Sequence, residues 1–185
     1  MRLRRRARAG LRTAAGGDPS GAPTRPPTLT GLVPVPTYRD RPATVPVDPR
    51  GADLGGRPCH LPVLGGGSWW LLLFLSSRCQ GCRQLWEALA HAPGSGLVGD
   101  ELVAVVTRDA GEEDVAALRP LAPAGVPLVM STPTWAAYGV QGPPFFALVD
   151  GRPGRASRVA TEGVAWSVPQ VAADVRRARL RAAGG

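Results

Sequence analysis

The stretch SWWLLLFLSSRCQGCRQLWEALAHA, residues 68–92, joins an uninterrupted apolar run to a segment with helical periodicity. The apolar run is short and lies between Gly67 and Ser76, which is typical of a strand buried on both faces of a sheet. Behind the cysteines, apolar residues recur at the spacing of one helix face. The stretch therefore predicts a core strand that leads directly into a helix, with two cysteines at the junction.

The rest of the chain continues to alternate the two kinds of pattern. It predicts further strands at 101–107, 126–131, 145–150 and 157–163, and helices at 109–121, 133–140 and 167–183. Because strands that alternate with helices need crossover connections, this order predicts a mostly parallel central sheet, to which a tight turn near Gly151 adds an antiparallel pair. The predicted fold class is α/β, a three-layer α/β/α sandwich with a central mixed sheet.

The first third of the chain differs from the rest in charge and in proline content. The formal net charge is +8, and residues 1–58 hold 11 of the arginines against 4 carboxylates. The opening of the chain is rich in Arg, Gly, Ala and Pro and has few large apolar residues. The apolar surface that it could bury is too small to offset the entropy lost on ordering it. We therefore predict a disordered Arg/Pro-rich tail and linker at 1–50 and one folded domain at 51–185. Residues 28–57 are expected to be extended or irregular, with at most a short strand against the domain.

The basic start of the chain has no apolar segment directly behind it, as a signal peptide would need. The apolar run at 69–75 is far shorter than the ~20 residues of a membrane helix. As written, the sequence predicts a cytoplasmic protein with no membrane span. A missing upstream start or anchor would instead make it extracytoplasmic and membrane-anchored. The basic tail lacks interleaved aromatic residues, so nucleic-acid binding is not expected.

Cys79 and Cys82 stand three residues apart at the predicted junction of strand and helix. One helical turn brings two such side chains within reach of a disulfide bond. The unpaired amides and the dipole at a helix N-terminus stabilise an anion, so the Cys79 thiolate should form easily, helped by the positive charges of Arg78 and Arg83. Gln80 and Gly81 tolerate the tight bend. We expect Cys79 to attack a substrate disulfide and Cys82 to resolve the mixed disulfide.

Three landmarks, in order, resemble the thioredoxin-like superfamily, in particular its TlpA/ResA-type thiol-disulfide reductases and the methylamine dehydrogenase maturation (MauD) proteins. The resemblance covers about residues 65–175. FLSSRCQGCRQL, at 74–85, looks like the strand, CxxC and helix of the maturation proteins. YGVQGPPFFALVDG, at 138–151, is similar to the family's stretch with a cis-proline and a strand ending in Asp-Gly, which places that proline at Pro144. The third landmark is Glu162-Gly163 before the last helix.

The resemblance implies a thiol-disulfide oxidoreductase that uses its CxxC dithiol to reduce or exchange disulfides. Its partners would be protein disulfide or thiol substrates and a redox partner, and no cofactor or metal is implied. The catalytic residues would be Cys79 and Cys82. The substrate pocket would be formed by Pro144, Pro143, Arg78, Gln80 and Gly81.

The chain departs from the family pattern at three positions. Arg78 stands where the reductases usually have tryptophan before the first cysteine, and Leu73 replaces the buried acid that thioredoxins place six residues before it. Pro143 has no N–H group, although family members use the backbone of that residue to pair with a bound substrate strand. One of the two expected hydrogen bonds to a substrate strand is therefore missing.

The sequence also allows other interpretations of the cysteines. Cys59 and His60 could join Cys79 and Cys82 in a zinc site, but neighbours in an extended chain point to opposite sides. A peroxidase of the peroxiredoxin type would need a PxxxTxxC loop, which SSRCQGC does not supply. A third alternative is a non-catalytic thioredoxin-fold binding module that recruits a partner through its basic tail.

Overall fold

The computed structural model describes residues 43–91, 97–154 and 156–184. The predicted tail therefore lies outside the described residues up to position 42. The elements are β1 (Arg50–Ala52), β2 (Pro58–His60), β3 (Trp69–Phe74), η2 (Gln80–Cys82), α1 (Arg83–His91), β4 (Leu102–Thr107), α2 (Val115–Leu118), β5 (Leu128–Met130), α3 (Thr132–Ala137), β6 (Phe145–Asp150), β7 (Arg158–Val164) and α4 (Val168–Ala183). Each strand and helix predicted beyond residue 65 is present, in the predicted order.

The strands form one sheet with the order β2-β1-β5-β4-β3-β6-β7. Its mixed character is confirmed, but the expectation of mostly parallel neighbours is wrong. The pairs β3–β4 and β4–β5 are parallel, whereas β1–β2, β1–β5, β3–β6 and β6–β7 are antiparallel. A parallel crossover must return the chain along the whole strand. The six residues of α3 are too few for that, so β6 starts at the edge where β3 ends, with Phe145 opposite Phe74.

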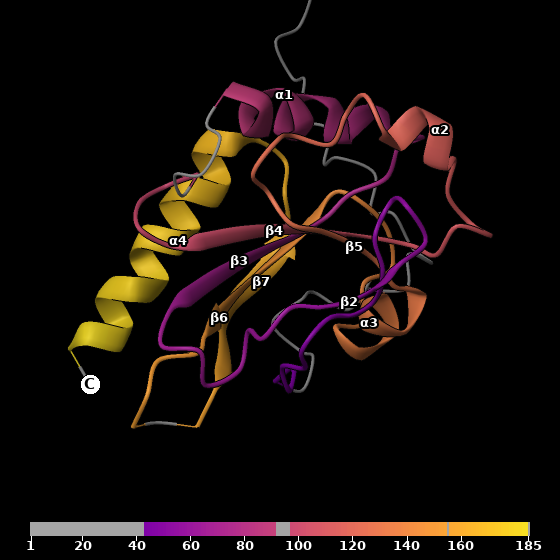
Figure 1. Ribbon diagram of the computed structural model, residues 1–185. Helices are drawn as coiled ribbons and strands as arrows, with labels where there is room; N and C mark the ends of the chain where they lie inside the picture. The colour runs from indigo at the N-terminus through magenta and orange to yellow at the C-terminus, as the bar shows by residue number, and fades with distance from the viewer. Residues whose placement is uncertain (1–42, 92–96, 155, 185) are drawn as a thin grey trace, which may run out of the picture. The chain divides into compact units, whose positions relative to one another are not determined.

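The three predicted layers are present (Figure 1). One face of the sheet packs against α1 and α4, and the other against α3. Successive residues of β3 alternate between the two cores, with Leu71 and Leu73 in the first and Leu72 and Phe74 in the second. All six residues of β3 are buried, which explains why its sequence is apolar without interruption.

The helix predicted at 109–121 is much shorter than expected, because α2 spans only Val115–Leu118. Its start is set by Asp114, whose side chain accepts a hydrogen bond from the backbone N–H of Ala117. Pro120 follows closely and has no N–H group with which to continue the helix. The acidic residues ahead of Asp114 therefore lie in a turn, outside the helix.

Residues 43–50, which the sequence pattern assigned to the linker, contact the sheet face that carries α3. The Tyr138 hydroxyl donates to the Val47 carbonyl oxygen at 2.9 Å, and the Thr44 hydroxyl donates to Glu162 Oε1 at 2.7 Å. Burial raises the pKa of the Tyr138 phenol, which stays protonated and available as a donor. This segment then leads into β1, the short strand expected against the domain.

Candidate redox site

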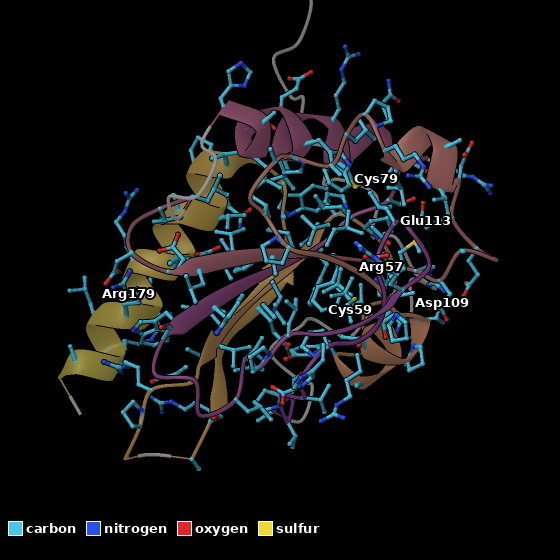
Figure 2. All side chains as sticks on the ribbon, viewed as in Figure 1. Arg57, Cys59, Cys79, Asp109, Glu113 and Arg179 are labelled. Atoms are coloured by element: carbon cyan, nitrogen blue, oxygen red, sulfur yellow. A yellow bond between two sulfur atoms is a disulfide. The ribbon has the colours of Figure 1, made fainter. Side chains whose placement is uncertain are left out.

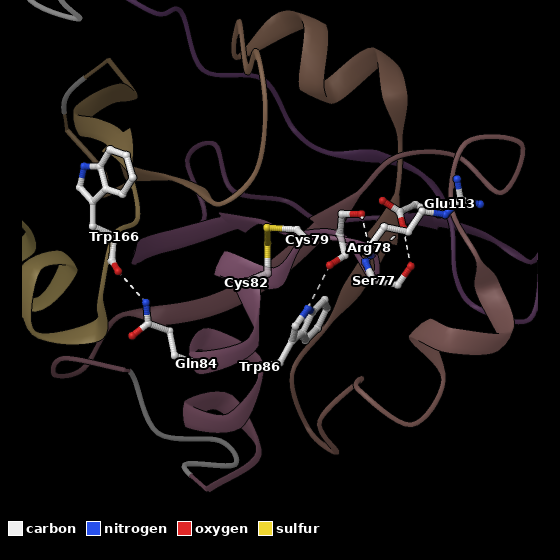
Figure 3. The surroundings of a disulfide bond; sticks show 9 residues. Ser77, Arg78, Cys79, Cys82, Gln84, Trp86, Glu113 and Trp166 are labelled. Atoms are coloured by element: carbon white, nitrogen blue, oxygen red, sulfur yellow. Dashed lines mark hydrogen bonds between the residues drawn. A yellow bond between two sulfur atoms is a disulfide. The ribbon is translucent and has the colours of Figure 1, made fainter.

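Cys79 and Cys82 are joined in a disulfide bond, with their Cα atoms 5.3 Å apart (Figure 3). Cys79 lies at the N-terminal end of η2, and Cys82 is the last residue of that single turn, which continues directly into α1. The Cys82 side chain is fully buried, whereas Cys79 is partly exposed. One sulfur of the pair is thus accessible to another molecule and the other is shielded by the core.

The turn between β3 and the first cysteine is held by contacts that the sequence pattern did not reveal. Glu113 is 6% exposed, and its Oε2 accepts hydrogen bonds from the Ser77 hydroxyl at 2.9 Å and the Ser77 backbone N–H at 3.2 Å. The Trp86 indole N–H donates to the Ser76 carbonyl oxygen at 3.5 Å. Figure 2 shows Glu113 on the same side of the molecule as Cys79. The acidic run at 112–114 is the sequence signal for this anchor, although by its pattern alone it favours a helix start.

Replacing Glu113 by alanine is expected to lower the free energy of unfolding by about 2 kcal/mol, because the partly buried backbone N–H and hydroxyl of Ser77 lose their carboxylate acceptor. Chemical denaturation of the two proteins measures the difference. The control is Glu87→Ala, which removes an exposed pair with Arg83 on α1 and should change stability very little. Equal effects of the two substitutions would show that Glu113 does not anchor the turn.

Pro144 lies close to the disulfide. The Pro143–Pro144 peptide bond is cis. A Cβ atom added at Gly81 would lie 3.4 Å from Pro144 Cδ and 3.9 Å from Cys79 Sγ, so the glycine, the proline and the accessible sulfur are in close proximity. An alanine Cβ at position 81 would therefore make ordinary van der Waals contact with the proline ring. The roles of Pro143, Pro144 and Gly81 in binding substrate remain predictions.

Arg78 and Gln80 flank the accessible cysteine, and both are exposed. Among the described residues, the Arg78 guanidinium forms no hydrogen bond or ion pair, although the Arg78 backbone N–H donates to Ser76 Oγ at 3.2 Å. Leu73 is fully buried in the core that contains Cys82. An apolar residue therefore occupies the position, six residues before Cys79, that corresponds to the buried acid of thioredoxins.

Trp166 is a second feature that sequence reasoning missed. It is 73% exposed and lies in the loop between β7 and α4. The Gln84 side-chain amide donates to the Trp166 carbonyl oxygen at 2.5 Å, and Figure 3 shows this bond reaching from α1 towards the loop. The available signal was a large aromatic residue directly before Ser167, which caps α4 by accepting from the Gln170 N–H.

Cys59 does not join the dithiol. It is a free, partly buried cysteine on β2 near the edge of the sheet, and Figure 2 shows it well apart from Cys79. Burial, with a smaller effect from Asp53, raises the pKa of the Cys59 thiol, which lowers its reactivity near neutral pH. His60 pairs with Asp48, their nitrogen and oxygen atoms 3.1 Å apart. Within the described ranges, no group of three or more His, Cys, Asp or Glu is arranged to hold a metal ion.

No helix in the described part of the chain has the length and apolar character that crossing a membrane requires. Neither family models nor curated proteins gave a match to this chain.

Comparison with solved structures finds bacterial thiol:disulfide proteins. A candidate thiol:disulfide interchange protein DsbE from Chlorobium tepidum is 21% identical with a TM-score of 0.55, covering 71% of this chain and 93% of its own. A thiol:disulfide interchange protein from Bacteroides sp. is 18% identical with a TM-score of 0.53, covering 73% and 88%. A secreted Mycobacterium tuberculosis disulfide oxidoreductase homologous to E. coli DsbE is 18% identical with a TM-score of 0.50, covering 69% and 94%. With its disulfide at the end of a core strand, the domain therefore has the thioredoxin-like fold that the sequence landmarks indicated.

Proposed function

We propose that this protein is a thiol-disulfide oxidoreductase that acts on protein disulfides through Cys79 and Cys82. The observation that carries the proposal is the asymmetry of the pair. An internal disulfide at the start of a helical segment has one partly exposed sulfur, on Cys79, and one fully buried sulfur, on Cys82. A disulfide with a purely structural role would not require one accessible sulfur beside Pro144.

In the reduced protein, the Cys79 thiolate attacks one sulfur of a substrate disulfide, and the other substrate sulfur leaves as a thiolate. A mixed disulfide between Cys79 and the substrate results. The Cys82 thiolate then attacks Cys79 Sγ, which re-forms the internal disulfide and releases the second substrate thiolate. Two electrons pass from the protein to the substrate. Run in reverse, the same exchange oxidises a substrate dithiol, and a redox partner restores the starting state in either direction.

The helix start supports the first step. The Cys82 N–H donates to the Cys79 carbonyl oxygen at 3.0 Å, which closes the single turn of η2. Cys79 is the N-cap residue of this turn, so it lies at the end where the first backbone amides of a helix have no intrahelical partner. Such amides, together with the dipole of the helical segment, stabilise a thiolate at the N-terminal position. Burial of Cys82 keeps it from external disulfides, so that its partner is the adjacent Cys79.

The test is a redox titration of the full chain against mixtures of reduced and oxidised glutathione, followed by alkylation and mass measurement. We expect one transition in which two alkylated thiols are lost together, while Cys59 stays alkylated throughout. A Cys59→Ser variant serves as the control and should give the same midpoint. If the mass pattern stays constant over the whole glutathione range, the dithiol does not cycle, and the binding-module alternative becomes the better interpretation.

A further inference from the structure

The backbone around Trp166 is fixed although its ring lies in solvent. The Trp166 N–H donates to Gln170 Oε1 at 3.0 Å, and its carbonyl oxygen accepts from Gln84 on α1. The preceding Ala165 N–H donates to the Pro144 carbonyl oxygen at 3.0 Å, which ties the loop to the proline beside the disulfide. The main chain that carries the indole is therefore fixed beside the disulfide region, and within the described ranges the ring has no aromatic or cation–π partner.

Few of the large apolar side chains that the structure describes are exposed, and the Trp166 indole is one of them. The large apolar residues that the structure exposes are Val45, Leu102, Trp166 and Leu180. Of these, Trp166 is linked to the disulfide region through the hydrogen bond between Ala165 and Pro144. Tryptophan gains more free energy than other side chains when a partner removes it from water, and it loses little conformational entropy in doing so.

The positive charge of Arg78 lies on the opposite side of the accessible sulfur from Trp166 (Figure 3). Three other arginines each pair with a carboxylate four residues away, namely Arg57, Arg83 and Arg108. Arg78 is exposed and, among the described residues, forms no ion pair with a carboxylate. Figure 3 shows the disulfide between Trp166 on one side and Arg78 on the other. In this view of Figure 3 the two side chains flank the accessible sulfur of Cys79, one on each side.

We propose that the site selects polypeptide disulfides whose reacting cysteine has a large apolar side chain on one flank and a carboxylate on the other. Trp166 contacts the apolar side chain, and Arg78 pairs with the carboxylate. The inference rests on the proposed function, since it concerns the substrate of the same dithiol. Side-chain recognition is needed here because Pro143 has no N–H group to donate to a substrate strand, so main-chain pairing alone gives less binding free energy.

The experiment uses short synthetic peptides whose cysteine carries a thionitrobenzoate in mixed disulfide. Attack by the reduced Cys79 on the peptide sulfur releases the coloured thionitrobenzoate anion and leaves the peptide on Cys79, so the second-order rate constant is read directly. One peptide has leucine and aspartate on opposite flanks, a second has the order reversed, and two more replace leucine by serine or aspartate by asparagine. Oxidised glutathione serves as a probe without an apolar flank.

Trp166→Ala should lower the rate constant for the better leucine peptide about tenfold and leave the serine peptide within about twofold. Trp166→Phe should keep most of the preference. Arg78→Gln should lower the rate constant of the aspartate peptides about threefold at low salt, and salt of about 0.5 M should remove the difference. Equal slowing of the serine and leucine peptides by Trp166→Ala would overturn the proposal, because it would indicate a structural role for Trp166.

The free protein gives a further check. Acrylamide should quench Trp166 fluorescence, taken as the difference between wild type and Trp166→Phe, and a leucine peptide trapped on Cys82→Ser should protect it. Shielding of Trp166 before any peptide is added would mean that residues 1–42 or a second copy cover it, which would overturn the proposal. Failure of the proposed function is distinguishable, because wild type would then also fail to react with oxidised glutathione and with every peptide.

Discussion

Replacing Cys79 by serine is expected to abolish disulfide exchange, with a loss of about three orders of magnitude or more in the rate of insulin reduction. A serine hydroxyl is not ionised near neutral pH and cannot form the mixed disulfide. The remaining thiol of the pair, on Cys82, is fully buried and so cannot take over the attack on an external disulfide. The measurement is the rate of insulin or model-disulfide reduction with an excess of reductant.

The companion variant Cys82→Ser separates attack from resolution. It keeps the accessible nucleophile, so it should react once with a substrate disulfide and then remain covalently attached to it. Non-reducing electrophoresis and mass measurement detect the adduct, which reductant should remove. A Cys59→Ser variant should behave as wild type in both assays. Full activity in Cys79→Ser would remove the basis of the proposed chemistry.

Replacing Phe74 by alanine is expected to lower the free energy of unfolding by about 3–5 kcal/mol, the largest single effect on stability that we expect. The Phe74 ring is fully buried at the end of β3. Three aromatic rings surround it, with centroid distances of 5.8 Å to Trp135, 5.3 Å to Tyr138 and 6.0 Å to Phe145. These come from α3, its C-terminal end and β6, so the cavity cannot close by moving one element.

Denaturant unfolding followed by circular dichroism measures this loss. The control is Leu180→Ala, since Leu180 is 75% exposed on α4 and its truncation should change the free energy of unfolding by less than about 0.5 kcal/mol. A loss below about 1 kcal/mol in Phe74→Ala would show that the α3 side of the sheet is packed more loosely than these contacts indicate.

The part of the fold that could be predicted is the part that depends on local pattern. The uninterrupted apolar run of β3 and the periodic helix behind it identify the strand, the helix and the position of Cys79 and Cys82 between them. The capping residues Ser131, Asp114 and Ser167 begin α3, α2 and α4. The spacing of Ser167 and Gln170 is that of a capping box, a signal that the sequence alone carries.

The rest depends on contacts between segments distant in the chain, which no local pattern encodes. The short strand β1 joins the sheet through a pairing of Ala52 with Met130, and the direction of β6 follows from how far α3 can carry the chain. The same limit applies to the site. Glu113 reaches Ser77, and the Trp166 loop reaches Pro144, only because the fold brings β4, β7 and the dithiol turn to one edge of the sheet.

The burial of Cys82 has a kinetic consequence. Since the sulfur of Cys79 is the one that another molecule can reach, the proposed function requires the substrate and the partner that recharges the dithiol to react at this same atom. Two proteins cannot bind at this atom together, so the proposed cycle is a double displacement in which one protein leaves before the other binds. Turnover in the proposed cycle is then limited by whichever of the substrate and the redox partner is scarcer or reacts more slowly. An excess of one slows the reaction of the other, because both compete for the same atom.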